Sequence, residues 1–62
     1  MTDDEKVLLD AVRDEPGFDE ALALDIVRKR DLAVATTEGI ITQQEAIDGL
    51  RARIRTALGR DL

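Results

Sequence analysis

Apolar residues recur at helical spacing in three segments of the chain, and polar or glycine-containing segments separate them. A spacing of three or four residues places such side chains on one face of a helix. Proline disfavours helical geometry at the residue before it, so Pro16-Gly17 ends the first helix, and Gly39 ends the second. We therefore expect an all-α protein, a small three-helix bundle formed by one domain over residues 1–62. The predicted helices cover residues 3–14, 20–36 and 43–58.

Polar residues at the start of each predicted helix are typical of N-caps. Thr2 is followed three residues later by Glu5, and Thr42 by Glu45, which is the spacing of a capping box. In that motif the threonine hydroxyl and the glutamate carboxylate each accept a hydrogen bond from the other residue's backbone N–H. Asp19 has the position of an N-cap before the second helix. These signals support all three helix starts.

The predicted helix 20–36 has apolar residues on two sides. A helix of this kind is normally buried on both sides. A middle helix in a three-helix bundle explains part of the pattern, whereas Leu24 and Leu32 are left for a partner. Arg30 interrupts the main stripe, so a break near Arg30-Asp31, with Asp31 as a new cap, is the alternative to one continuous helix. The main stripe holds Leu22, Ala23, Ile26, Val27, Ala33 and Val34, and Leu24, Leu32 and Ala35 lie opposite it.

The predicted helix 43–58 has a single apolar face, which folding alone explains. Gly49 lies within this helix and costs about 1 kcal/mol relative to alanine. We expect close packing against a neighbouring helix to be the reason for a glycine at that position. The apolar face consists of Ala46, Ile47, Leu50, Ile54, Ala57 and Leu58.

The composition narrows the available chemistry. The chain contains no cysteine, histidine, serine, tyrosine or tryptophan, and Phe18 is its one aromatic residue. These absences exclude disulfides, thiolate or imidazole metal sites, and serine or cysteine nucleophiles. The sequence also contains no calcium-binding loop and no glycine-rich phosphate loop. We therefore expect no enzymatic activity, no cofactor and no metal site.

Charge is unevenly distributed along the chain, whose net charge is −5. Residues 1–25 contain nine acids and two bases, a charge of −7, and residues 26–62 contain five acids and seven bases, a charge of +2. The acidic half is typical of a solvated surface. No apolar run approaches the roughly 20 residues that span a bilayer, and acids follow Met1 where a secretory signal is basic. We expect a cytoplasmic protein without a membrane span.

Residues 31–55 contain elements of a helix-turn-helix DNA-binding motif. Ala35 and Gly39 have the spacing of the small residue and the turn glycine of that motif. Glu45, however, stands where the motif needs an aliphatic residue, and the net negative charge disfavours a polyanionic ligand. DNA binding is therefore an alternative function. The candidate nucleic-acid contacts are Gln43, Gln44, Arg51 and Arg55.

The segment between the second and third predicted helices reads Gly39-Ile40-Ile41-Thr42, and Glu45 follows it. This pattern resembles the signature of SHOCT-type short helical domains, and the resemblance covers Leu32–Ile54. That family has an aromatic residue after the glutamate, which Ala46 replaces here, and the following lysine is missing. The resemblance implies a helical hairpin with a role in oligomerisation rather than catalysis.

These features predict a small non-enzymatic helical protein–protein interaction module, such as an accessory or regulatory subunit or a homo-oligomer. A small aromatic-poor core gives limited stability, which a partner protein or a second copy in a homodimer would supplement. A less favoured reading is an acidic mimic of nucleic acid that blocks a basic partner. The predicted interface lies on the second apolar side of helix 20–36. Its candidate residues are Leu24, Asp25, Arg28, Leu32 and Ala35.

Overall fold

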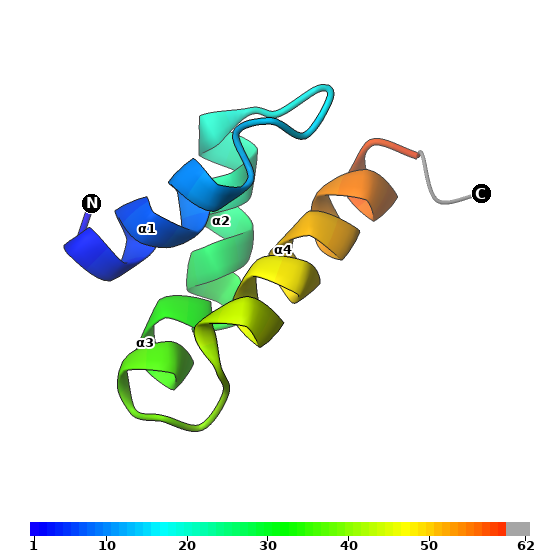
Figure 1. Ribbon diagram of the computed structural model, residues 1–62. Coiled ribbons are helices and arrows are strands. Elements are labelled where there is room, and N and C mark those ends of the chain that lie inside the picture. The colour runs from blue at the N-terminus through cyan, green and yellow to red at the C-terminus, as the bar shows by residue number, and fades with distance from the viewer. Residues whose placement is uncertain (60–62) are drawn as a thin grey trace.

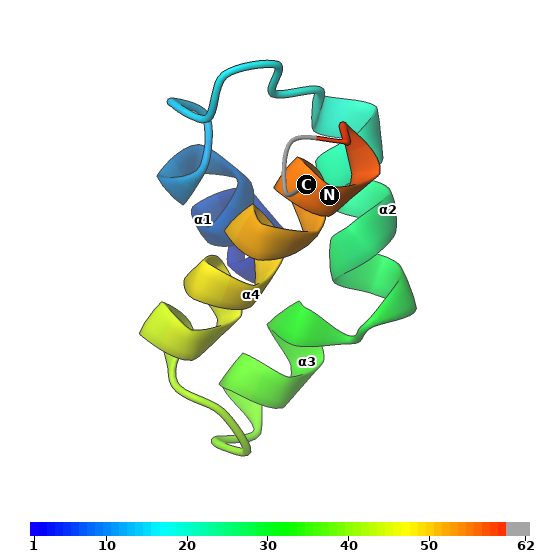
Figure 2. The same cartoon turned by 90° about the vertical axis from the view of Figure 1, so that its right-hand side faces the viewer.

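The computed structural model describes residues 1–59, and this part of the chain forms four helices and no strand (Figure 1). The predicted all-α class is confirmed, whereas the predicted count of three helices is wrong, because residues 20–36 form two helices. α4 runs from the α3 end of the molecule back toward the α1–α2 loop, with α1 and α2 on either side of it (Figure 2). The helices are α1 (Asp3–Ala11), α2 (Glu20–Lys29), α3 (Leu32–Thr37) and α4 (Gln43–Ala57).

The caps predicted for three helix starts are confirmed. At α1, the Glu5 N–H donates to the Thr2 hydroxyl at 3.2 Å, and the Thr2 N–H donates to the Glu5 carboxylate at 2.8 Å. Thr42 and Glu45 form the same box at α4, with two hydrogen bonds of 3.0 Å. The Asp19 carboxylate accepts two backbone N–H groups in the first turn of α2. Each cap satisfies N–H groups that have no partner within the helix.

α1 ends at Ala11, three residues before the predicted end of the helix at residue 14. The hydrogen-bond spacing shortens there to three residues. The Val12 N–H donates to the Leu9 carbonyl, and the Glu15 N–H donates to the Val12 carbonyl. Pro16 follows, and Gly17 adopts a φ of +80°, which an L side chain rarely adopts. This early turn brings Glu15 to the inside of the molecule, where it is 3% exposed.

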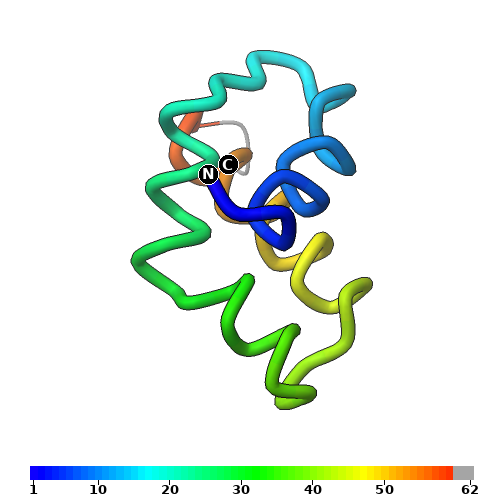
Figure 3. Tube along the Cα trace, turned by 90° about the vertical axis from the view of Figure 1, so that its left-hand side faces the viewer, coloured from blue at the N-terminus to red at the C-terminus, as the bar shows by residue number. Residues whose placement is uncertain are grey.

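The chain breaks between α2 and α3 at Arg30 and Asp31, so the predicted continuous helix 20–36 is wrong and its alternative is confirmed. Asp31 has a φ of +52°, a left-handed conformation that aspartate tolerates better than most residues. Its side chain, however, makes no capping hydrogen bond. Figure 3 shows the change of direction at this point. The turn lets Leu32 and Ala33 pack against the core, which offsets the cost of the strained residue.

The core lies between the four helices, and every pair of helices is in contact. α2 touches the other three, which explains why its sequence is apolar on two sides. Six residues that are partly buried pack against the core: Phe18, Leu24, Ile26, Leu32, Ile41 and Ile47. The buried apolar residues are Leu8, Leu9, Val12, Ala23, Val27, Ala33, Ala46, Leu50 and Ile54.

Gly39, before α4, and Gly49, within it, differ in whether the structure requires glycine. Gly39 has a φ of +75° and forms the turn after α3, as predicted. Gly49 is helical, and a Cβ atom placed on it would meet no atom within 4 Å from a neighbouring element. The expected close packing at Gly49 is therefore wrong, and the structure supplies no reason for glycine there.

Candidate protein-binding groove

Six arginines lie within residues 1–59, and four of them form ion pairs inside the chain. Arg13 pairs with Asp10 on α1 at 2.7 Å, and its guanidinium lies over the ring of Phe18. The pairs of the other three connect different elements: Arg28 with Glu5, and both Arg51 and Arg55 with Glu15. Three of the six arginines in this range therefore link different elements of the fold through ion pairs.

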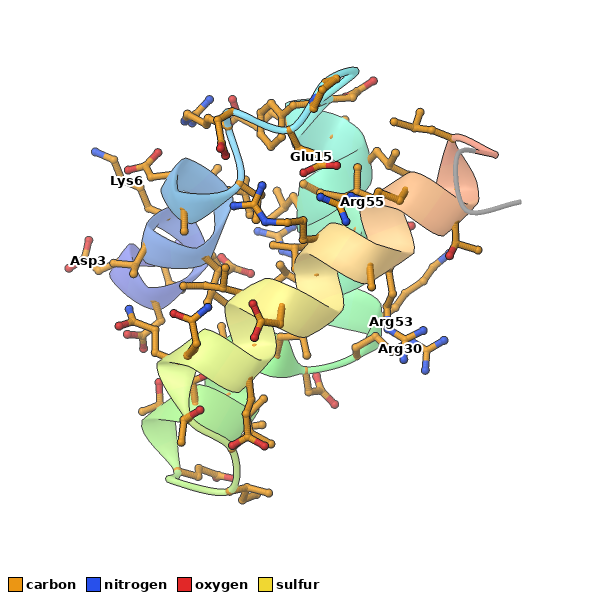
Figure 4. All side chains as sticks on the ribbon, turned by 45° about the vertical axis from the view of Figure 1, so that its right-hand side comes forward. Asp3, Lys6, Glu15, Arg30, Arg53 and Arg55 are labelled. Carbon is orange, nitrogen blue, oxygen red and sulfur yellow. The ribbon has the colours of Figure 1, made fainter. Side chains whose placement is uncertain are left out.

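Glu15 forms the most extensive of these ion pairs. Arg51 Nη1 donates to its carboxylate at 2.8 Å, and Arg55 Nε donates to the other oxygen at 2.5 Å (Figure 4). The hydrogen bonds from Arg55 and Arg51 lower the pKa of Glu15 to about 2, and they outweigh the desolvation that would raise it. Arg51 also reaches the Ala11 carbonyl at 2.9 Å. We call Glu15, Arg51 and Arg55 the Glu15 clamp, since they fasten the α1–α2 loop to α4.

Glu5 makes a second link, between α1 and α2. Its carboxylate accepts the capping hydrogen bond from Thr2 and another from Arg28 Nε at 2.9 Å. Chiefly because of the Arg28 hydrogen bond, the pKa of Glu5 is lowered to about 2. Glu5 is 8% exposed, so this charge is largely enclosed as well. Arg28 is thereby held on the side of α2 that faces α1.

The remaining two arginines, Arg30 and Arg53, lie together at an open groove between α2 and α4. Both are exposed, neither forms an ion pair with any residue in the described range 1–59, and both line this groove, one from each side (Figure 4). The groove has a volume of about 360 Å³. Its walls are formed by Leu22, Asp25, Ile26, Lys29, Arg30, Arg53, Thr56 and Ala57.

The sequence contains a signal that distinguishes these two arginines from the others. On a helix, a base pairs most readily with an acid three or four residues away. Arg13, Arg28 and Arg51 each have an acid at that distance. Arg55 has none but reaches Glu15 from across the fold. Arg30 and Arg53 have no such neighbour, and the fold brings no acid of residues 1–59 to them either.

The structure places the five predicted interface residues in different surroundings. Leu24 and Leu32 are partly buried and pack against the core, and Ala35 is half-buried. Arg28 is paired with Glu5, whereas Asp25 lies in the wall of the groove and pairs with Lys29 at 3.1 Å. The fold itself thus contacts the leucines that the sequence left for a partner. Sequence reasoning missed Leu22, Ile26, Arg30 and Arg53 as a surface, because they come together only through the packing of α2 on α4.

The four candidate nucleic-acid contacts are also separated. Gln43 and Gln44 are exposed in the first turn of α4, where the Gln44 amide donates to Asp48 at 2.9 Å. Arg51 and Arg55 point instead toward Glu15, two and three turns farther along the helix. Arg51 also pairs with Asp14 at 3.2 Å, so two acids balance the charge of these two arginines. DNA binding and mimicry of nucleic acid stay predictions.

A second hollow, of about 280 Å³, lies between α1 and α3 and differs in charge from the groove. Its charged wall residues are the acids Asp4 and Glu38, and the Thr37 hydroxyl donates to Asp4 at 2.5 Å. Val34 is 53% exposed at its edge. Across residues 1–59, no three acids come close enough together to hold a metal ion, and no helix has the length and apolar character needed to cross a membrane.

Comparison of the chain with protein families, with curated proteins and with solved structures finds no match. The similarity of Leu32–Ile54 to SHOCT-type domains therefore stays a prediction. The groove between α2 and α4 is defined by this chain's own geometry, and its two arginines are the feature that separates it from the rest of the surface.

Proposed function

We propose that this chain is a small, non-enzymatic, helical protein–protein interaction module and that its partner binds the groove between α2 and α4. The observation that carries the proposal is the position of Arg30 and Arg53. They are the two arginines of residues 1–59 without an ion pair, and both line this groove. Two like charges that line the same groove repel each other, and a partner that supplies negative charge relieves that repulsion.

The apolar part of the groove supports the same function. Leu22 and Ile26 are half-buried, one turn apart on α2, and Ala57 lies exposed on α4 across from them. Arginine is enriched in protein interfaces, and in this groove burial of the apolar atoms would give affinity while the charges give orientation. The groove is shallow and small, so a short segment of a partner would fill it.

Peptide selection followed by blocking variants tests this proposal with the purified chain. Random peptides displayed on phage are selected on the wild-type protein, and the affinity of the enriched peptides is measured by fluorescence anisotropy. Ala57→Trp places a large ring in the groove, and Ala52→Trp places the same ring on an exposed part of α4 that does not line the groove. We expect Ala57→Trp to weaken binding at least tenfold and Ala52→Trp to leave it unchanged.

Two results would contradict the proposed function. The first is that selection enriches no binding peptide. The second is that the enriched peptides bind both tryptophan variants as well as they bind the wild type, which would place their site elsewhere. Circular dichroism of both variants shows that they keep the helical fold, so that a loss of binding reports on the groove.

A further inference from the structure

The groove has a charge opposite to that of the molecule as a whole. Its walls contain three bases, Lys29, Arg30 and Arg53, and one acid, Asp25, in a chain whose net charge is −5. Asp25 is paired with Lys29, so the two unpaired charges are both positive. They lie at the end of the groove where α2 stops, because Arg30 is the residue that follows Lys29, the last residue of α2. A ligand would therefore place negative charge at that end.

The spacing along α2 sets the dimensions of such a ligand. Leu22 and Lys29 line the same groove seven residues apart, which corresponds to about 10 Å along the helix axis. Ile26 and Arg30 are four residues apart, or about 6 Å. The groove thus matches about two helical turns of a ligand that carries an aliphatic side chain and, one turn away, a carboxylate.

The backbone of the groove favours a helical ligand over an extended one. An extended peptide binds best where a free strand edge pairs with its N–H and C=O groups. α2 and α4 offer no such edge, since their backbone groups bond within each helix. A helix satisfies its own backbone groups and needs only side-chain contacts from the groove.

From these observations we infer that the groove binds an acidic amphipathic helix of another protein, with an aliphatic side chain on Leu22, Ile26 and Ala57 and a carboxylate between Arg30 and Arg53. The inference rests on the proposed function and names the chemistry of its ligand. A carboxylate accepts hydrogen bonds from a guanidinium in a two-pronged geometry, which fixes the direction of the helix in the groove. A nucleic acid fits less well, because two arginines without a nearby aromatic residue form a short basic site on an acidic protein.

The test examines the sequences and affinities of peptides selected on the purified chain. We expect the enriched peptides to carry aspartate or glutamate three or four residues from leucine, isoleucine or valine. Replacing that acid with its amide should weaken binding about tenfold or more, as should Arg53→Gln in the protein. Arg53→Glu should abolish binding of the acidic peptide and restore binding of the same peptide with lysine in place of the acid.

A matched control separates local pairing from a change in net charge. Gln43→Glu combined with Gln44→Glu alters the net charge of the chain by the same amount as Arg53→Glu, but at the start of α4, away from the groove. We expect this double variant to bind the acidic peptide within about twofold of the wild type at 150 mM salt, where the Debye length is about 8 Å. An equal loss in both proteins would show a general charge effect and overturn the inference.

The remaining outcomes are distinguishable from failure of the proposed function. Peptides that bind the groove, as Ala57→Trp reports, but contain no acid would overturn the inference and leave the interaction module standing. Duplex DNA that binds at low salt and is released by Arg30→Gln with Arg53→Gln would overturn it in favour of a nucleic acid. A dimer in sedimentation equilibrium that Ala57→Trp dissociates would overturn it in favour of a second copy. Absence of any groove ligand would contradict both.

Discussion

Two pairs of arginines on this small protein have opposite surroundings. Arg51 and Arg55 lie one turn apart on α4 and share the enclosed carboxylate of Glu15. Arg53 lies between them in sequence but on the groove side of the same helix, where it lines the groove with Arg30 and has no ion pair within residues 1–59. The first pair stabilises the fold, and the second leaves charge available to a ligand.

This difference shows that a basic residue has to be judged by its partner. Judged by sequence position alone, Arg51 and Arg55 were candidate nucleic-acid contacts. In the structure these two are paired with Glu15, whereas Arg53 is unpaired within residues 1–59. The helical period explains the reversal, since residues two apart on a helix point in different directions.

The largest expected effect on the stability of the fold comes from Glu15→Gln. The change leaves Arg51 and Arg55 close together without their shared counter-charge, and removing one partner of an enclosed ion pair is strongly destabilising. We expect the thermal midpoint to fall by on the order of 10 °C in a circular dichroism melt. Glu38→Gln is the control, because Glu38 is exposed at the end of α3. An equal thermal midpoint for the two variants would contradict a structural role for the Glu15 clamp.

Lowering the pH should weaken the ion pairs of Glu5 and Glu15. The pKa values of Glu5 and Glu15 lie at about 2 in the folded chain, below the ordinary value of 4.5. A carboxyl group with a lowered folded pKa contributes stability that is fully present above its unfolded pKa and lost as the pH falls through the folded value. We therefore expect the urea midpoint to fall steadily between pH 4.5 and pH 2. In Glu15→Gln this decline should be smaller, and an unchanged decline would contradict the assignment.

Gly49→Ala is expected to have a smaller effect and to raise the stability of the fold rather than lower it. Nothing from a neighbouring element lies within 4 Å of the new methyl group, and alanine is the better helix former. We expect the free energy of unfolding to rise by about 1 kcal/mol in urea titrations. Gly39→Ala is the contrasting variant and should lower stability, since Gly39 has a φ of +75°. A loss of stability in Gly49→Ala would indicate a packing role for that glycine.

The smallest effect on stability is expected from Arg30→Gln and Arg53→Gln. Neither side chain has an ion pair within residues 1–59, so the free energy of unfolding should change by no more than about 0.5 kcal/mol in either case. The same urea titrations measure it. A destabilisation as large as that of Glu15→Gln would show that these arginines hold the fold together rather than face a ligand.

Local signals in the sequence predicted much of the fold. The two capping boxes, Asp19 and Gly39 have side-chain or backbone requirements that act within four residues, and all were predicted correctly. The sequence allowed the α2–α3 break only as an alternative to a continuous helix. A left-handed Asp31 becomes favourable only when Leu32 packs against the core, and that contact cannot be read from the local sequence. The early end of α1 depends in the same way on Glu15 reaching α4.

The groove depends on long-range packing and was not predicted. The absence of an acid three or four residues from Arg30 and Arg53 was readable in the sequence, but their convergence was not. Glu15 and Arg55 are 40 residues apart, and no local rule pairs them. The predicted interface chose Leu24 and Leu32 because a straight helix would expose them, whereas the real chain turns between them.

The most direct test of the contrast between the two arginine pairs is the ¹H–¹⁵N spectrum of the arginine Nε–Hε groups in the free protein. Hydrogen bonds to Glu15 should shift the Arg55 signal away from its random-coil position and slow its exchange with water. Arg30 and Arg53 should show fast exchange and random-coil positions, and they should shift when an acidic groove ligand is added. Protected signals for Arg30 and Arg53 in the free protein, with an exposed one for Arg55, would contradict the account.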